Sequence, residues 1–256
     1  MRIPAWLRQV KPAHVSRSRA GRCPVCGRRA LFIIVDVAHV RENAWCIWCG
    51  SSSRNRHVAR CVVETFAHHG LRCLRDIARR PSLAVYNISA GGCFARVWGK
   101  QPHITYSECF DDCERGEWRD GVLCQDVERL TFGDSTFDLV ISEDVFEHVS
   151  DYRRGFWEVR RVLKPGGYHV FSVPVGFTHP TLSRFEVSDG RQVPVLPVEH
   201  HGDPLRGQIA VCTSFGYDLL GYLEGLGFEA RSELSRYEDE CRHGTFDSCT
   251  FVTQRA

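Results

Sequence analysis

The sequence DVERLTFGDSTFDLVISEDVFEHV at residues 126–149, together with RVLKPGG at residues 161–167, decides the fold. Within the first stretch, FDLVIS at residues 137–142 is a continuous apolar run, which is typical of a strand buried on both faces. From residue 81 onward such runs alternate with segments of helical periodicity. This alternation predicts an α/β fold, with a parallel sheet covered by helices on both faces.

Seven strands are expected in this part of the chain. They are short runs rich in apolar and β-branched residues, and turn residues separate them. In chain order they cover residues 83–88, 103–108, 121–124, 137–142, 168–173, 229–234 and 249–253. We expect an antiparallel pair late in the sequence.

The two quoted stretches resemble the class I S-adenosylmethionine-dependent methyltransferases, and more narrowly the type 11 methyltransferase family. The segments D-x-x-x-L-x-F-x-D-x-x-F-D, E-H-V and R-V-L-K-P-G-G carry the resemblance in combination. It covers residues 81–175 well and the C-terminal strands loosely. The resemblance implies a Rossmann-like seven-stranded sheet, S-adenosylmethionine as cofactor, and methyl transfer as the reaction.

A glycine loop, Ser89-Ala90-Gly91-Gly92, follows the first expected strand at the edge where open α/β sheets bind ligands. Its glycines would let the backbone approach a ligand closely, and the helix that follows offers N–H groups to the methionine carboxylate. The loop departs from the family pattern, with Asn87 where an acidic residue is usual and two glycines in place of three. A plain turn is the alternative interpretation.

Glu108 ends the second expected strand, 17 residues after Gly91. A carboxylate there can accept hydrogen bonds from both ribose hydroxyls, as in dinucleotide-binding folds; a surface glutamate is the alternative. The resemblance implies that Asp126 accepts a hydrogen bond from the adenine amino group, with Val127 alongside. Phe110 is the nearest aromatic residue that could pack on the adenine.

The acceptor site is expected over the end of the fourth strand, where Ser142 is also expected to contact the cofactor. Glu143, Asp144, Glu147 and His148 follow it. His148 has an unperturbed pKa suited to a general base, and Glu147 could orient it or hold a cation. Alternatively, the Glu-His pair caps a helix or shapes the fold.

Residues 176–212 are expected to form an insertion over the acceptor site. FEVSDGRQVPV at residues 185–195 is typical of a hairpin with Asp-Gly in its turn. The sequence EHHGD follows at residues 199–203. His200 and His201 could serve as a base, a substrate clamp or metal ligands. Alternatively, the polar side chains of this loop only hold the hairpin in position.

Two C-x-x-C-G motifs lie near the N-terminus, with nineteen residues between the pairs. Their cysteines are Cys23, Cys26, Cys46 and Cys49. This spacing is typical of a four-cysteine zinc site, in which thiolates bind Zn²⁺ tetrahedrally at about 2.3 Å. The sequence therefore predicts a small zinc ribbon with a closed structural site. Ordinary reduced cysteines or a redox pair are the alternatives.

Three regions are expected: a basic arm and zinc ribbon at residues 1–52, a helical linker at 53–80, and the methyltransferase domain at 81–256. Residues 1–80 hold 16 Lys and Arg against 4 Asp and Glu, whereas the remainder holds 17 against 27. Such a basic segment is a hint of an anionic partner. The basic residues crowding the start of the linker helix could be a solvated or ribbon-packed face, or an anion contact; they are Arg54, Arg56, His57 and Arg60.

Three functions are compatible with these features. The first is methyl transfer to a hydroxyl, amine or carboxylate of a small molecule or glycan. The second is RNA methylation, with the basic ribbon binding nucleic acid; the third is a non-catalytic adapter. An apolar content of 43% excludes a largely disordered chain. Neither an 18-residue apolar run nor a signal-peptide core is present, so a cytoplasmic protein without membrane contact is expected.

Overall fold

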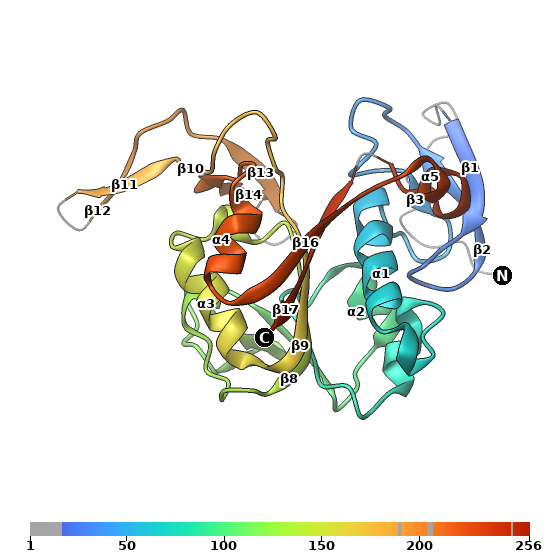
Figure 1. The fold of residues 1–256 in the computed structure, drawn as a ribbon, viewed down its shortest axis with the longest axis horizontal. Helices are drawn as coiled ribbons and strands as arrows, with labels where there is room; N and C mark the ends of the chain where they lie inside the picture. Colours follow the sequence, from blue (N-terminus) through green and yellow to red (C-terminus); the bar gives the residue numbers. More distant parts are fainter. Residues whose placement is uncertain (1–16, 189–190, 204–206, 247) are drawn as a thin grey trace.

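The computed structural model describes residues 17–188, 191–203, 207–246 and 248–256. Its centre is an eight-stranded mixed sheet with the order β16-β17-β9-β8-β4-β5-β7-β6 (Figure 1). The strands are β4 (Val85–Asn87), β5 (Ile104–Glu108), β6 (Trp118–Arg119), β7 (Val122–Cys124), β8 (Phe137–Glu143), β9 (Leu163–Ser172), β16 (Phe228–Leu234) and β17 (Cys249–Arg255).

The pairing confirms an α/β sheet of the Rossmann-like type. Strands β7, β5, β4, β8 and β9 run parallel to one another, and β17 and β16 add an antiparallel pair at one edge. All seven expected strands are present. The count of seven is nevertheless wrong, because β6 pairs antiparallel with β7 through a turn at Asp120 and Gly121. Two residues are too few to show the alternation by which a strand is recognised.

Helices cover both faces of the sheet, as expected (Figure 1). They are α1 (Ser53–Thr65), α2 (Gly92–Trp98), α3 (Tyr152–Val162) and α4 (Leu219–Gly225), whereas α5 (Tyr237–His243) packs against residues 17–22 near the N-terminus. In β4, Val85 belongs to the core beneath α1 and α2, and its neighbour Tyr86 belongs to the core beneath α3 and α4. Successive strand residues point to opposite faces, so the sheet separates two apolar layers.

The cysteine motifs belong to a three-stranded antiparallel ribbon of β1 (Arg17–Arg22), β2 (Arg29–Ile34) and β3 (Trp45–Cys46). Strand β1, which precedes the first motif and carries alternate basic residues, was not expected. Val25 of the ribbon shares one core with Val58 of α1 and Val170 of β9. The segment 53–80 is thus packed between ribbon and sheet rather than exposed as a linker.

Three of the four basic residues at the start of α1 are buried in this arrangement, and Arg54 is partly buried. Arg56 and His57 are 0% exposed and Arg60 is 4% exposed. Arg60 Nε lies 3.1 Å from Asp239 Oδ1, and His57 Nδ1 lies 2.7 Å from Thr250 Oγ1. A solvated face is therefore wrong for these three residues. The Arg56 guanidinium lies 4.1 Å from the centre of the Phe32 ring in β2, which confirms packing on the ribbon for this residue.

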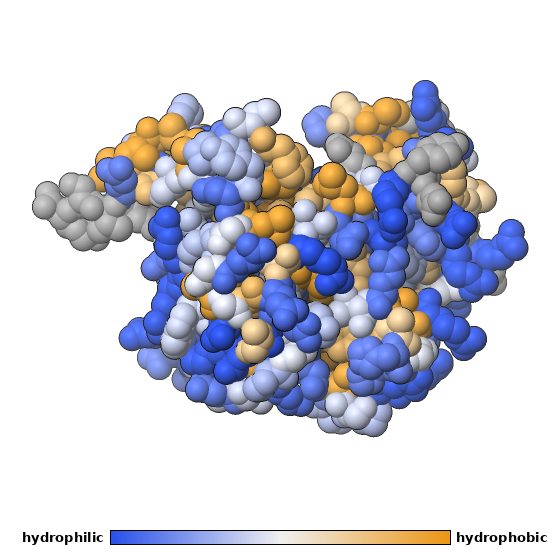
Figure 2. Space-filling view, in the orientation of Figure 1, coloured by the Kyte–Doolittle hydropathy of each residue, from blue (hydrophilic) through white to orange (hydrophobic). Residues whose placement is uncertain are grey.

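The insertion forms short hairpins. Its strands are β10 (Leu182–Ser183), β11 (Phe185–Ser188), β12 (Arg191–Pro194), β13 (His200–Asp203), β14 (Gly207–Ala210) and β15 (Thr213–Ser214). The register of β11 on β12 confirms the expected hairpin; its Asp189-Gly190 turn lies outside the described residues. Apolar surface gathers over β11 (Figure 2), and Val193 and Val195 are exposed there. Among the described residues, no helix combines the length and apolar character needed to cross a membrane.

Candidate functional site

A cavity of about 310 Å³ lies at the carboxyl ends of the parallel strands. This is the edge at which open α/β sheets bind ligands, and the volume suits a small molecule. The lining comes from segments that follow four strands and from β14: Ile88, Ser107, Glu108, Cys109, Gln125, Asp126, Val127, Glu128, Asp144, Val145, His148, Val149, Ser150 and Ile209.

Glu108 connects this cavity to the glycine loop. Its Oε1 accepts hydrogen bonds from the Ala90 amide at 2.8 Å and from Ser89 Oγ at 3.1 Å. The Gly91 amide in turn donates to Ser89 Oγ at 3.2 Å. The carboxylate at the end of β5 therefore fixes the loop after β4 and also lines the cavity.

The loop itself lies beside the cavity. Among the described residues, Ile88 belongs to the lining, whereas Ser89, Ala90, Gly91 and Gly92 do not. Gly92 has φ +78°, a conformation that side chains rarely adopt, and a Cβ at Gly91 would meet nothing closer than Ser89 Oγ at 3.9 Å. The protein's own packing thus leaves space at Gly91 for a group approaching the backbone.

Asp126 and Val127 both line the cavity, at the end of β7. Asp126 caps the short helix η5 (Val127–Arg129), where its Oδ1 accepts from the Glu128 amide at 2.9 Å. Phe110 lies outside the lining and packs beneath the Arg119 guanidinium, 4.9 Å from the ring centre. Cys109, the residue before Phe110, does line the cavity.

Ser142 is not part of the cavity wall, contrary to expectation. It is 1% exposed, and its Oγ lies 2.9 Å from His169 Nε2. Ser142 is two residues beyond Val140, which belongs to the core beneath α3, so both side chains lie on that covered face of β8.

Glu143 and Asp144, expected at the acceptor site, both contact the N-terminal region, and Asp144 also lines the cavity. Asn55 Nδ2 donates to Glu143 Oε1 at 2.6 Å. Both terminal nitrogens of Arg41 lie 2.8 Å from the Asp144 oxygens, and Arg54 Nε lies 3.2 Å from Oδ2. Burial opposes ionisation of Asp144, but Arg54 and Arg41 outweigh it and hold the pKa of Asp144 well below its usual range.

Three of the four expected catalytic side chains come together beside the cavity. Glu147, in the short helix η6 (Phe146–His148), is 1% exposed. Its Oε1 lies 3.8 Å from His148 Nε2 and 3.8 Å from His201 Nδ1. His148 Nδ1 lies 2.8 Å from the Ala210 carbonyl. Because a carbonyl only accepts, Nδ1 is the donor in this hydrogen bond.

His200 does not join this group. It is exposed, and alternation along β13 places it on the face opposite to His201. Burial raises the pKa of Glu147 well above its usual value. The group therefore consists of one buried carboxyl and two imidazoles contributed by η6 and the insertion.

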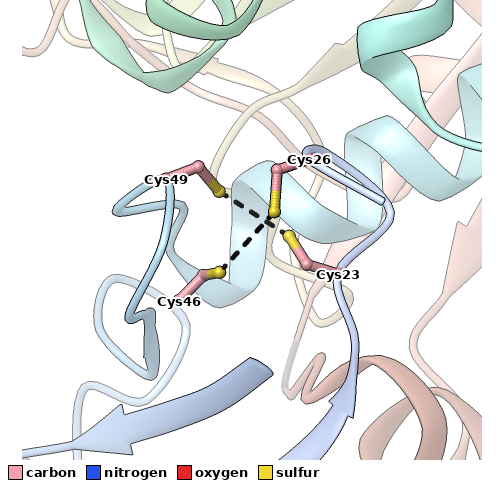
Figure 3. A group of neighbouring side chains, drawn as sticks. All are labelled: Cys23, Cys26, Cys46 and Cys49. Carbon is pink, nitrogen blue, oxygen red and sulfur yellow. Dashed lines mark hydrogen bonds between the residues drawn. The ribbon is translucent and has the colours of Figure 1, made fainter. Parts of the chain in front are cut away.

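The four cysteines of the ribbon converge from two turns (Figure 3). The Sγ atoms of Cys23 and Cys49 are 3.7 Å apart, and those of Cys26 and Cys46 are 4.0 Å apart. All four sulfurs lie within 4.8 Å of one another and all four residues are buried. Gly27 and Gly50 have positive φ, as expected at the end of such turns.

Comparison with known proteins matches residues 94–171 to the family model described as "Methyltransferase domain". Malonyl-[acyl-carrier protein] O-methyltransferase of Methylovorus sp. (strain MP688) is 33% identical over 100 residues, or 30% of this chain. Dimethylglycine N-methyltransferase of Parasynechococcus marenigrum (strain WH8102) is 36% identical over 69 residues, or 24% of this chain. The chain spans 34% and 25% of the lengths of these curated relatives.

Solved structures of methyltransferases overlap more of the chain but less closely. An amino pentose methyltransferase from Micromonospora echinaspora has 16% identity and a TM-score of 0.45, covering 76% of this chain and 97% of its own. An S-adenosylmethionine-dependent methyltransferase from Mesorhizobium loti has 18% identity and a TM-score of 0.42, covering 68% and 91%. At such TM-scores the overlaps are loose, and the fold rests on the strand order given above.

Proposed function

We propose that this chain is an S-adenosylmethionine-dependent methyltransferase whose acceptor is a hydroxyl, amine or carboxylate of a small molecule or glycan. The observation that carries the proposal is the cavity at the carboxyl edge of the sheet, which is lined by Glu108, the last residue of β5, and by Asp126, which follows β7. The match of residues 94–171 to a methyltransferase-domain model supports the reaction type.

The residues around the cavity fit the parts of this cofactor. Glu108 would accept hydrogen bonds from the ribose hydroxyls while its Oε1 holds the glycine loop. The backbone at Gly91 would accommodate the methionine end, since no neighbouring atom fills the space of a Cβ there. Asp126 and Val127 would contact the adenine. The bound cofactor supplies a methyl group already activated by a sulfonium.

The acceptor would be held next to the group formed by Glu147, His148 and His201. Methyl transfer is an in-line displacement, so the protein's main task is to hold the acceptor atom in line with the methyl carbon. His148 lines the cavity, and its Nε2 can accept a proton or bind a cation. The insertion brings His201 to this place through the hairpin of β13 and β14.

Replacing Glu108 by alanine is expected to weaken S-adenosylhomocysteine binding by one to two orders of magnitude. A hydrogen bond to a charged group contributes about 1.5–3 kcal/mol, and about 1.4 kcal/mol corresponds to a factor of ten. Calorimetric titration measures the change. Ser89→Ala is the matched control, because it removes one loop contact and keeps the carboxylate. Equal weakening in both variants would mean that Glu108 merely holds the loop.

The cysteine cluster fits a structural zinc ion. Tetrahedral bonds of about 2.3 Å separate neighbouring sulfurs by about 3.8 Å, close to the 3.7 and 4.0 Å between the paired Sγ atoms. Arg56 adds support, because it is 0% exposed and its Nε donates to the His243 carbonyl at 2.8 Å. Among the described residues no carboxylate pairs with Arg56, and four thiolates around Zn²⁺ would supply the negative charge that a buried guanidinium requires.

The arrangement of the arginines favours a small acceptor over RNA. Arg41 and Arg54 are engaged with Asp144, and Arg60 with Asp239. Binding of nucleic acid depends on lysines and arginines that neutralise phosphates. The basic composition that suggested an RNA substrate is thus partly accounted for by contacts within the chain.

A further inference from the structure

The carboxyl of Glu147 is an unusual group in this fold. It is 1% exposed, and neither of its oxygens has a hydrogen-bond partner among the described residues. A buried polar group without a partner costs about 1–3 kcal/mol, and an unpaired charge costs more. Such a group therefore calls for a ligand that the described part of the chain does not supply.

Two imidazole nitrogens face this carboxyl at matching distances. His148 Nε2 and His201 Nδ1 each lie 3.8 Å from Glu147 Oε1, which is too long for a hydrogen bond. Metal bonds to imidazole nitrogen and carboxylate oxygen are about 2.1 Å long, so one cation can span up to about 4.2 Å between two such atoms. Three ligand atoms of this group lie within 4.8 Å of one another.

The orientation of His148 also suits a metal ligand. Its Nδ1–H is directed to the Ala210 carbonyl at 2.8 Å, which fixes the orientation of the ring, and Nε2 lies 3.8 Å from Glu147 Oε1. Histidine ligands in metal sites commonly donate their other ring N–H to a carbonyl or carboxylate in this way.

We propose that Glu147, His148 and His201 form a second metal site, which binds one divalent transition-metal cation such as zinc or iron(II). Two imidazoles and one carboxylate suit these ions, and three protein ligands leave coordination positions open. The site is distinct from the ribbon cysteines in its ligands and in its place at the cavity.

A cation here would select the acceptor. His148 and Ile209, the residue opposite His201 in the hairpin, both line the cavity, so a ligand in the cavity could reach the open positions. This inference about the acceptor rests on the proposed function. A cation with open positions favours acceptors that can bind it through oxygen, such as a hydroxyl beside a second oxygen or a carboxylate. With the cation bound, His148 is a metal ligand rather than a proton acceptor.

Cobalt(II) titration of the full chain with the ribbon site already loaded with zinc tests the proposal without any cofactor or substrate. One equivalent is expected to bind, with the weak visible bands of nitrogen and oxygen ligands and without the intense sulfur charge-transfer bands of a cysteine site. His201→Ala is expected to weaken cobalt binding by about 100-fold, since even the loss of a group supporting a metal ligand costs 10–100-fold.

Two further variants make the outcome decisive. Glu147→Gln keeps the volume of the side chain and removes the anionic ligand oxygen, so it is expected to retain the fold while weakening cobalt binding as His201→Ala does. His200→Ala, on the opposite face of β13, is expected to bind cobalt like the unaltered protein. No cobalt binding, sulfur charge-transfer bands, or equal binding by all variants would overturn the proposal. Cobalt binding in a protein that fails to bind S-adenosylhomocysteine would overturn the proposed function and leave the metal site standing.

Discussion

Cys46→Ser is expected to abolish tight zinc binding and to cause the largest loss of stability of any single substitution considered. Structural zinc sites with thiolate ligands contribute about 10–16 kcal/mol of binding free energy, which is comparable to the 5–15 kcal/mol that stabilises a whole domain. Cys46 is 0% exposed and shares its core with α1 and β9. The damage should therefore extend from the ribbon into the sheet.

Elemental analysis after dialysis, combined with thermal unfolding, measures both effects. The unaltered protein should retain one zinc per chain more than the variant, because the substitution removes the cysteine-bound ion and leaves Glu147, His148 and His201 unchanged. Cys241→Ser is the matched control, because Cys241 is an exposed cysteine outside the cluster. The assignment would be contradicted if the protein without zinc were as stable as the protein with zinc. A disulfide among Cys23, Cys26, Cys46 and Cys49 would also contradict it.

Asp144→Asn is expected to destabilise the fold by about 3 kcal/mol, the lower end of the cost of breaking a buried ion pair. The side chain of Asp144 is 16% exposed. Its carboxylate forms ion pairs with two nitrogens of Arg41 and with one nitrogen of Arg54. The substitution leaves both guanidinium groups without this anion. It would loosen the attachment of the N-terminal region to the end of β8, and chemical denaturation would show the loss.

The pH dependence gives this expectation a definite sign. The folded-state pKa of Asp144 is depressed, so its contribution is present above the unfolded pKa of about 3.9 and is lost as the pH falls toward the folded pKa. The difference between the unaltered protein and Asp144→Asn should shrink in acid. Glu42→Gln is the control: Glu42 contacts the same two arginines but is 47% exposed, so it should cost less than about 1 kcal/mol. Equal effects of the two substitutions would contradict the account.

The fold was predictable because its signals are local. The apolar run at residues 137–142 and the alternation around it belong to strands that are buried on both faces, and such runs stand out in a sequence. Strand β1 and the two-residue β6 lack such a signal, since one is polar and exposed and the other too short. The packing of α1 against both ribbon and sheet depends on tertiary contacts that no local pattern contains.

The candidate site was predictable only in part, for the same reason. Glu108 and Asp126 follow strands directly, so the strand ends place them at the cavity. Asp144 also follows a strand, but its partner Arg41 lies 103 residues earlier in the chain. Only the three-dimensional arrangement shows that Asp144 holds the N-terminal region. Likewise, the sequence could not separate His201 from His200, because only the register of β13 decides which faces Glu147.

Calorimetric titration of the unaltered, zinc-loaded protein with S-adenosylmethionine and S-adenosylhomocysteine tests the central claim most directly. The account predicts one saturable site per chain for each ligand, with the two competing for it, because the contacts proposed for Glu108, Asp126 and Gly91 belong to one cofactor site. No binding of either ligand at millimolar concentration by a folded protein would contradict it.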